Sequence, residues 1–168
     1  GLPYVGVLYG VFMLTKDGIK VIEYNARFGD PEAMNVLSIL KSDFLSICIS
    51  LVEGKLEKEE VLFDELATVC KYVVPLGYPN NPMKGFEVFC DQNDSSLFLA
   101  SVMFKNKKLI ACGSRTAAVV GKNRDIQKAE AFAEQGVSNI SGKLFHRKDI
   151  GTKDLIDLRV KIMKELLS

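Results

Sequence analysis

The chain has 168 residues, of which 48% are hydrophobic and 26% charged, a balance typical of a folded globular protein. Its 22 basic and 21 acidic residues leave a formal net charge of +1, which argues against nucleic acid or an anionic membrane surface as a partner. Its apolar runs are far shorter than the roughly 20 residues that span a bilayer, and its first residues lack the layout of a signal peptide. We therefore expect a cytoplasmic protein.

The first elements form a predicted antiparallel hairpin. Two β-rich apolar runs, Tyr4–Thr15 and Ile19–Tyr24, are separated by Lys16-Asp17-Gly18. An Asp-Gly pair between two such runs is a strong hairpin signal. Because the sequence enters this hairpin with no preceding element, we expect the 168 residues to begin inside a larger domain.

Two helices are predicted after the hairpin. Asp30 is suited to an N-cap and Pro31 to the first helical position, and apolar residues then recur at helical spacing. A second helix is expected from Ser42, as its N-cap, to a stop at Gly54.

A domain boundary is expected near residue 68, where a charged stretch gives way to β-rich sequence, so that the domains are residues 1–68 and 69–168. The second domain is predicted to contain an antiparallel meander, with one turn at Lys105–Lys107, and two helices, Asp125–Glu134 and Thr152–Leu167. Its strands are expected at Ala67–Pro75, Phe86–Cys90, Leu97–Phe104, Lys108–Cys112 and Thr116–Val120. The predicted fold class is α+β.

Glu23, Asn25 and Arg27 form the local pattern most suggestive of chemistry. Side chains alternate along an extended strand, so Glu23, Asn25 and, if the extended segment continues that far, Arg27 project from one face while Ile22 and Tyr24 face the other way. Mg²⁺ prefers oxygen ligands together with substrate phosphates, and Arg can grip a carboxylate or phosphate. The grouping is compatible with a Mg-nucleotide or acyl-phosphate site. The same alternation would also arise on the solvent face of an ordinary hairpin.

Several segments resemble phosphoribosylamine-glycine ligases. Tyr4–Gly10 and Lys20–Glu32, which ends in Arg-Phe-Gly-Asp-Pro-Glu, resemble the end of the ATP-grasp region of that family. The resemblance covers essentially the whole chain, and Ala26 and Ala33-Met34 are similar to the archaeal members. Further matching segments are Gly77-Tyr78-Pro79, Lys84-Gly85, Gly113-Ser114-Arg115 and His146–Gly151.

The resemblance implies the C-terminal part of an ATP-grasp domain, made of an antiparallel hairpin plus helices, followed by a small α+β domain with an antiparallel sheet. It implies a ligation of purine biosynthesis in which ATP phosphorylates glycine and 5-phosphoribosylamine then displaces the phosphate. ATP, glycine and 5-phosphoribosylamine would be the substrates, with Mg²⁺ or Mn²⁺ as cofactor. The ATP-binding N-terminal portion would be a further partner, and we expect the 168 residues alone to be inactive.

Within that resemblance, Glu23 and Asn25 fall on the metal-ligand positions of the family. We hypothesise that Arg27 steadies the acyl phosphate and that Asp30 helps to orient an amine. Many ATP-grasp enzymes have another metal ligand on the preceding strand, where this chain has Val11, which cannot coordinate. A second metal ion would therefore depend more on phosphates, water and Glu23.

The loop Gly113-Ser114-Arg115 is a candidate for binding the phosphate of phosphoribosylamine, because glycine lets backbone N–H groups approach an anion and Arg grips phosphate oxygens. Lys84 and Arg147 are weaker candidates of the same kind. By themselves these residues would also suit an ordinary hairpin turn and exposed surface positions. His146, the only histidine, is assigned no chemistry.

Three alternatives remain open. The chain could belong to another ATP-grasp ligase, such as the aminoimidazole ribonucleotide carboxylating enzyme or a biotin carboxylase, which a substrate screen would identify. It could be a non-catalytic subunit or a proteolytic fragment whose apolar hairpin pairs with a missing half. A generic α+β binding module would show no dependence on Mg²⁺ or nucleotide.

Overall fold

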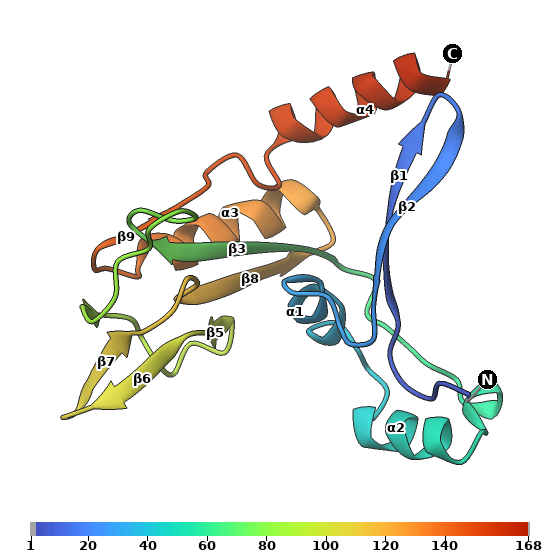
Figure 1. The fold of residues 1–168 in the computed structure, drawn as a ribbon, viewed down its shortest axis with the longest axis horizontal. Coiled ribbons are helices and arrows are strands. Elements are labelled where there is room, and N and C mark those ends of the chain that lie inside the picture. The colour runs from blue at the N-terminus through green and yellow to red at the C-terminus, as the bar shows by residue number, and fades with distance from the viewer. Residues whose placement is uncertain (1–2, 168) are drawn as a thin grey trace. The chain divides into compact units, whose positions relative to one another are not determined.

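The computed structural model describes residues 3–167 and contains helices and antiparallel sheets, as the sequence predicts (Figure 1). It divides into two compact units. The first comprises the described residues up to Glu65 together with those from Leu158 onward, and the second comprises Leu66–Asp157. Among the described residues, no helix combines the length and the apolar character that a membrane span requires.

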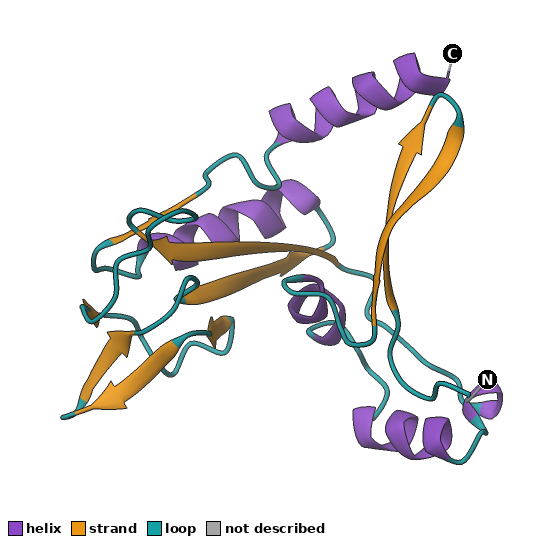
Figure 2. Ribbon diagram, in the orientation of Figure 1, coloured by secondary structure: helices purple, strands orange, loops and turns teal. Residues whose placement is uncertain are grey.

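The first unit contains a long β-hairpin (Figure 2). Strand β1 (Tyr9–Thr15) pairs antiparallel with strand β2 (Gly18–Asn25), with a register shift between Val11 and Phe12. The predicted hairpin is therefore confirmed, although its first strand begins at Tyr9 and not at Tyr4.

Helix α1 (Glu32–Leu37) follows the hairpin, but Asp30 is not its N-cap. The chain first makes a turn in which the Gly29 carbonyl accepts a hydrogen bond from the Ala33 amide at 2.9 Å. The helix then begins at Glu32 without a capping side chain. The prediction of Asp30 as a cap was wrong because this turn delays the start of the helix.

Helix α2 (Phe44–Val52) is capped by Asp43 and not by the predicted Ser42. The Asp43 carboxylate accepts a hydrogen bond from the Ser46 amide at 2.7 Å, and this bond holds the pKa of Asp43 below its usual value. The Ser42 hydroxyl instead accepts a hydrogen bond from the Leu62 amide at 2.8 Å. A contact distant in sequence therefore decided between two good capping residues. A single 3₁₀ turn, η1 (Leu56–Lys58), lies between this helix and that contact.

The second unit contains a four-stranded antiparallel sheet in the order β5-β8-β3-β9 (Figure 1). Helix α3 (Ile126–Ser138) packs against the two central strands. Val73, Val119 and Val137 form the buried cluster between helix and sheet, each at most 2% exposed. The strands are β3 (Ala67–Pro75), β5 (Leu97–Leu99), β8 (Ala117–Asn123) and β9 (Leu144–His146).

Small residues allow α3 to lie close to the sheet. A methyl group at Gly121 would overlap the Ala129 carbonyl, and one at Gly136 would lie 2.6 Å from a methyl carbon of Val119. Gly136 is therefore a packing residue inside the helix. The helix continues to Ser138, so the predicted end at Glu134 was wrong.

A second antiparallel sheet has the order β4-β7-β6, with strands β4 (Glu87–Val88), β6 (Val102–Lys105) and β7 (Lys108–Ala111). The predicted turn after Lys105 is confirmed, and its residues Asn106 and Lys107 have φ values of 50° and 62°.

The single strand predicted over Leu97–Phe104 was wrong, and so was the continuous meander. The amides of Ala100 and Ser101 donate to the carbonyls of Thr116 and Arg115, both at 2.9 Å. These bonds bend the chain between β5 and β6, so the two strands enter different sheets. Such a bend depends on pairing partners that are distant in the sequence.

Helix α4 (Lys153–Leu167) is present as predicted and crosses the division between the units. Two exposed ion pairs lie along it, Lys153–Asp157 and Lys161–Glu165, and in each pair the two partners are one turn apart. None of its described residues is buried, and the apolar side chains of Leu158 and Ile162 are exposed.

Candidate functional site

Glu23 and Asn25 lie together at the end of β2. The Asn25 amide nitrogen donates a hydrogen bond to the Glu23 carboxylate at 2.9 Å. This contact follows from strand alternation, because residues two apart project from the same face. Glu23 is exposed and Asn25 half-buried, so both side chains remain open to a ligand.

Tyr9 and Glu32 lie beside this pair and were not among the predicted site residues. Tyr9 pairs with Asn25 across the hairpin. The pKa of Tyr9 is raised, chiefly by the hydrogen bond to the Glu32 carboxylate and further by slight desolvation and by the negative charges of Glu32 and Glu23. Gly29 leaves room for both side chains, since a Cβ there would lie 2.5 Å from Glu32 Oε2 and 3.0 Å from the Tyr9 ring.

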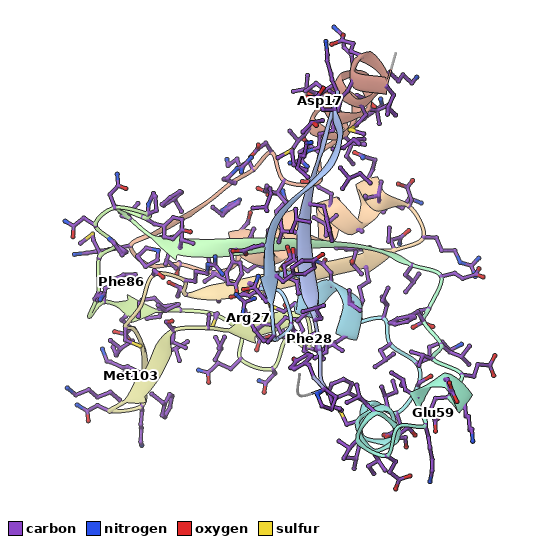
Figure 3. All side chains as sticks on the ribbon, turned by 45° about the vertical axis from the view of Figure 1, so that its right-hand side comes forward. Asp17, Arg27, Phe28, Glu59, Phe86 and Met103 are labelled. Atoms are coloured by element: carbon purple, nitrogen blue, oxygen red, sulfur yellow. The ribbon has the colours of Figure 1, made fainter. Side chains whose placement is uncertain are left out.

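Arg27 and Asp30 lie in the turn segment at the end of β2. Figure 3 shows Arg27 and Phe28 at one end of the hairpin and Asp17 at the other. The Arg27 guanidinium donates to the Phe28 carbonyl at 2.8 Å, and its charge acts on Tyr9. Arg27 therefore lies near the Glu23–Asn25 pair, although it is outside the strand that was expected to place all three on one face.

The side-chain oxygens of Glu23 and Asn25 fit part of a site for a hard divalent cation, because carboxylate and amide oxygens are suitable ligands. Across residues 3–167, no group of three or more His, Cys, Asp or Glu side chains is arranged to hold a metal ion. Val11 lies directly opposite Glu23 and offers no donor. The Asn25 nitrogen now faces Glu23, so its oxygen could reach an ion shared with Glu23 only after the amide turns over.

In the second unit, backbone hydrogen bonds join the loops that carry the predicted phosphate-binding residues. The Gly85 amide donates to the Ala111 carbonyl at 2.7 Å, and the Cys112 amide donates to the Ser101 carbonyl at 2.9 Å. Gly113 packs so closely on Ser101 that a methyl group there would overlap the serine side chain. Lys84 and the loop Gly113-Ser114-Arg115 are thus brought to neighbouring positions.

Lys84 also lines a shallow hollow of about 460 Å³ on the second sheet. Lys105 provides a second positive charge there, and Cys112 contributes an exposed thiol. The remaining lining residues are Gly85, Met103, Ile110 and Ala111. Two lysines over an otherwise mainly apolar lining favour an anionic ligand with an apolar part.

Arg115 and Arg147 flank the same part of strand β3. Ala117, two residues after Arg115, and His146, the residue before Arg147, both pair with Val73, one on each side of β3. The Arg115 guanidinium lies 5.3 Å from the centre of the Tyr72 ring, at the distance of a cation–π contact. Arg147 is exposed and binds Asp149 through two hydrogen bonds of 3.0 and 2.5 Å.

Residues 68–153 match the sequence model of the family described as phosphoribosylglycinamide synthetase, C domain, which covers just over half of the chain. The chain belongs to the phosphoribosylglycinamide synthetase family. Residues 1–33 match the model of the ATP-grasp (A) domain of the same family. The resemblance seen in the sequence is therefore confirmed.

Curated relatives of this family member are named phosphoribosylamine–glycine ligase and include archaeal proteins. The protein from Methanococcus maripaludis is 53% identical over 98% of this chain, and the protein from Methanocaldococcus jannaschii is 52% identical over 97%. The chain spans 38% of the length of each. It thus corresponds to well under half of these relatives.

A crystal structure of a phosphoribosylamine–glycine ligase from Thermotoga maritima has the same fold as this chain. The TM-score is 0.73 at 26% sequence identity, over 85% of this chain and 36% of that one. The predicted fold class, the closing part of an ATP-grasp domain followed by an α+β domain of the family, is in agreement with this likeness.

Proposed function

We propose that this chain is the C-terminal portion of a ligase that joins glycine to 5-phosphoribosylamine, with hydrolysis of ATP to ADP and phosphate, in the second step of de novo purine biosynthesis. The observation that carries the proposal is the 53% identity over 98% of the chain to a curated phosphoribosylamine–glycine ligase. The contact between Glu23 and Asn25 and the convergence of the basic loops support it.

The proposed reaction has two steps. A carboxylate oxygen of glycine attacks the γ-phosphorus of ATP, the bond to the bridging oxygen of ADP breaks, and glycyl phosphate forms. The amine nitrogen of 5-phosphoribosylamine then attacks the glycyl carbonyl carbon, the bond to phosphate breaks, and phosphate and a proton are released. Neither step requires a covalent bond to the protein, so the protein acts by positioning the reactants and neutralising charge.

The first unit would act on the transferred phosphoryl group. Glu23 and Asn25 would hold Mg²⁺ or Mn²⁺, which when bound supplies positive charge next to the phosphate oxygens. Arg27 would steady the acyl phosphate with its guanidinium, and Asp30 would accept a hydrogen bond from the attacking amine. The raised pKa of Tyr9 keeps its hydroxyl protonated, so it remains a hydrogen-bond donor beside this pair.

The second unit would bind the phosphate of 5-phosphoribosylamine. Arg115, with the backbone and hydroxyl of Gly113-Ser114, would provide the main contacts, and Lys84 and Arg147 would add positive charge from either side. Arg is suited to this role because its planar group can donate two parallel hydrogen bonds to a phosphate. Residues 1–68 would thus serve phosphoryl transfer and residues 69–168 the sugar phosphate.

The remaining partner would be the ATP-binding portion of the ligase. Apolar side chains are exposed on both faces of the hairpin, as shown by the consecutive residues Phe12 at 51% and Met13 at 53%. A surface of this kind favours burial against another protein segment. The proposal therefore predicts that residues 1–168 alone make no product.

The proposal can be tested by grafting residues 1–168 onto the remainder of the Methanococcus maripaludis ligase in place of the matching segment. We expect this chimera to form glycinamide ribonucleotide from ATP, glycine and 5-phosphoribosylamine, with one ADP released per product, and the isolated chain to form none. A folded chimera without product would contradict the proposal, and an active isolated chain would contradict the need for the other portion. Faster turnover of a different carboxylate or amine would favour another ATP-grasp ligase.

The metal assignment predicts a large effect of Glu23→Gln in the chimera. We expect kcat to fall about 100-fold, because a lost ligand weakens charge neutralisation during phosphoryl transfer. The Mg²⁺ concentration for half-maximal rate should rise at the same time. Glu57→Gln is the matched control, since it removes the same charge from an exposed position in η1. Equal Mg²⁺ dependence of the two variants would remove Glu23 from the metal site.

A further inference from the structure

Lys71 carries a positive charge inside the second unit. Its side chain is completely buried on β3, in the middle of an otherwise largely apolar strand. Its ammonium group donates to Glu130 Oε1 and Glu134 Oε2, both at 2.6 Å, and to the Lys148 carbonyl at 2.9 Å. An ammonium has three N–H donors, so each of them is used within the protein. Lys71 therefore has no donor left for a substrate.

Glu134 extends this network to His146. Its Oε2 binds Lys71, and its Oε1 lies 3.0 Å from His146 Nε2. Partial burial alone would raise the pKa of Glu134, but the hydrogen bonds and charges of Lys71 and His146 outweigh it and hold the pKa below its usual value. The Glu134 carboxylate thus stays ionised and joins the strand lysine to the histidine.

The network holds the backbone on both sides of Arg147. His146 is fixed through its ring by Glu134 and through its pairing with Val73, while the Lys148 carbonyl is fixed by Lys71. Asp149 engages two donors of the Arg147 guanidinium and leaves the others for a ligand. The residues on both sides of Arg147 are therefore held by the network, while the Arg147 side chain itself is held by Asp149.

We propose that Lys71, Glu134 and His146 are positioning residues that orient Arg147 toward the phosphate of the sugar-phosphate substrate. This inference rests on the proposed function, in which Arg147 contributes to that phosphate site. The three residues would act through the backbone of residues 146–148 and would touch no substrate. Their loss should therefore weaken binding of the sugar phosphate without slowing phosphoryl transfer from ATP.

Glu130 and Glu134 provide a matched pair of variants for the test. Both carboxylates lie 2.6 Å from the Lys71 ammonium, but Glu134 also lies 3.0 Å from His146 Nε2. Glu130→Gln and Glu134→Gln should therefore destabilise the unit similarly. Only Glu134→Gln should disturb the segment around Arg147.

In the active chimera, we expect Glu134→Gln to raise KM for 5-phosphoribosylamine about tenfold, because a small misplacement of a binding group has a large effect. The values of kcat and of KM for ATP should remain close to those of the unmodified chimera, and Glu130→Gln should leave all three unchanged. An equal rise of KM in both variants, or no rise in Glu134→Gln, would overturn the positioning role.

A second measurement separates this inference from the proposed function. Hydrogen exchange of the amides of residues 147–150 in the 168-residue chain should be faster in Glu134→Gln than in Glu130→Gln at equal melting temperature. Equal exchange in the two variants would overturn the inference even if the chimera is active. A chimera without ligase activity would refute the proposed function while the exchange result still decides whether the network orders this segment.

Discussion

The two units differ in how they use apolar residues. In the second unit, valines and alanines from β3, β8 and α3 are buried against one another and form continuous clusters. In the first unit, the only buried residues that the structure describes are Gly29 and Ser50. The hairpin of the first unit is rich in the same apolar residue types, yet Phe12, Val21 and Ile22 are all more than half exposed. Apolar strands therefore pair antiparallel in both units, but they form a buried core only where a second layer covers them.

The largest effect that would sharpen this comparison is expected for Gly121→Ala in the second unit. The added methyl group would overlap the Ala129 carbonyl, which belongs to the backbone of α3 and cannot rotate away. We expect the free energy of unfolding to fall by about 3 kcal/mol. Chemical denaturation of the 168-residue chain, followed by circular dichroism, measures this loss.

Gly85→Ala is the control for that prediction. A methyl group there meets nothing within 4 Å, so only the backbone conformation at φ +77° opposes it. We expect a loss of about 1 kcal/mol. Equal losses at the two positions would show that α3 can move away from β8, and that the core is less tightly packed than the structure indicates.

The second comparison sets Val73→Ala in the core against Phe12→Ala on the hairpin. Val73 is 2% exposed and Phe12 is 51% exposed. We expect Val73→Ala to lower the free energy of unfolding of the isolated chain by about 2 kcal/mol, and Phe12→Ala to lower it by about 0.5 kcal/mol.

The chimera provides a direct test of that difference. If the rest of the ligase covers the hairpin, Phe12→Ala should cost about 3 kcal/mol there, as for a buried aromatic side chain, while the effect of Val73→Ala should not change. An effect of Phe12→Ala that is equally small in both proteins would mean that this hairpin surface stays exposed.

The smallest expected effect concerns pH. The pKa of Glu134 is lower in the folded chain than its ordinary value of 4.5. The unfolded chain therefore binds the proton more tightly, so the stabilisation by Glu134 is present above pH 4.5 and is lost as the pH falls through the folded pKa. Glu134→Gln should flatten the dependence of the melting temperature on pH below 4.5. An unchanged slope would show that Glu134 does not contribute to acid sensitivity.

The sequence predicted those elements whose signals are local. The Asp17-Gly18 hairpin, the turn after Lys105 and helices α3 and α4 each depend on turn residues or on apolar periodicity. Pairing between distant strands was not predictable in the same way. The path from β5 to β6 is set by bonds to Arg115 and Thr116, and β9, with only three residues, was missed.

The same distinction holds for the site. The contact between Glu23 and Asn25 follows from strand alternation, which the sequence contains. The proximity of Tyr9 to Glu32 depends on the hairpin register and on the turn at Gly29. Counting back from the Asp17-Gly18 turn would have placed Tyr9 opposite Tyr24, and only the register shift between Val11 and Phe12 moves it opposite Asn25. Lys71 also gave a signal that could have been used, since a lysine within an apolar strand must find partners if it is buried.

The close approach of α3 to β8 has a consequence for how this protein can vary and move. Because the carbonyl of Ala129 lies against Gly121, the helix cannot slide along the strand or accept a larger residue at either position without losing the contact. Glu130 and Glu134 belong to this same helix, so the close contact between Gly121 and Ala129 also maintains their distance to Lys71. Homologous chains should therefore change these positions together, and the segment around Arg147 should move with α3 as one rigid body.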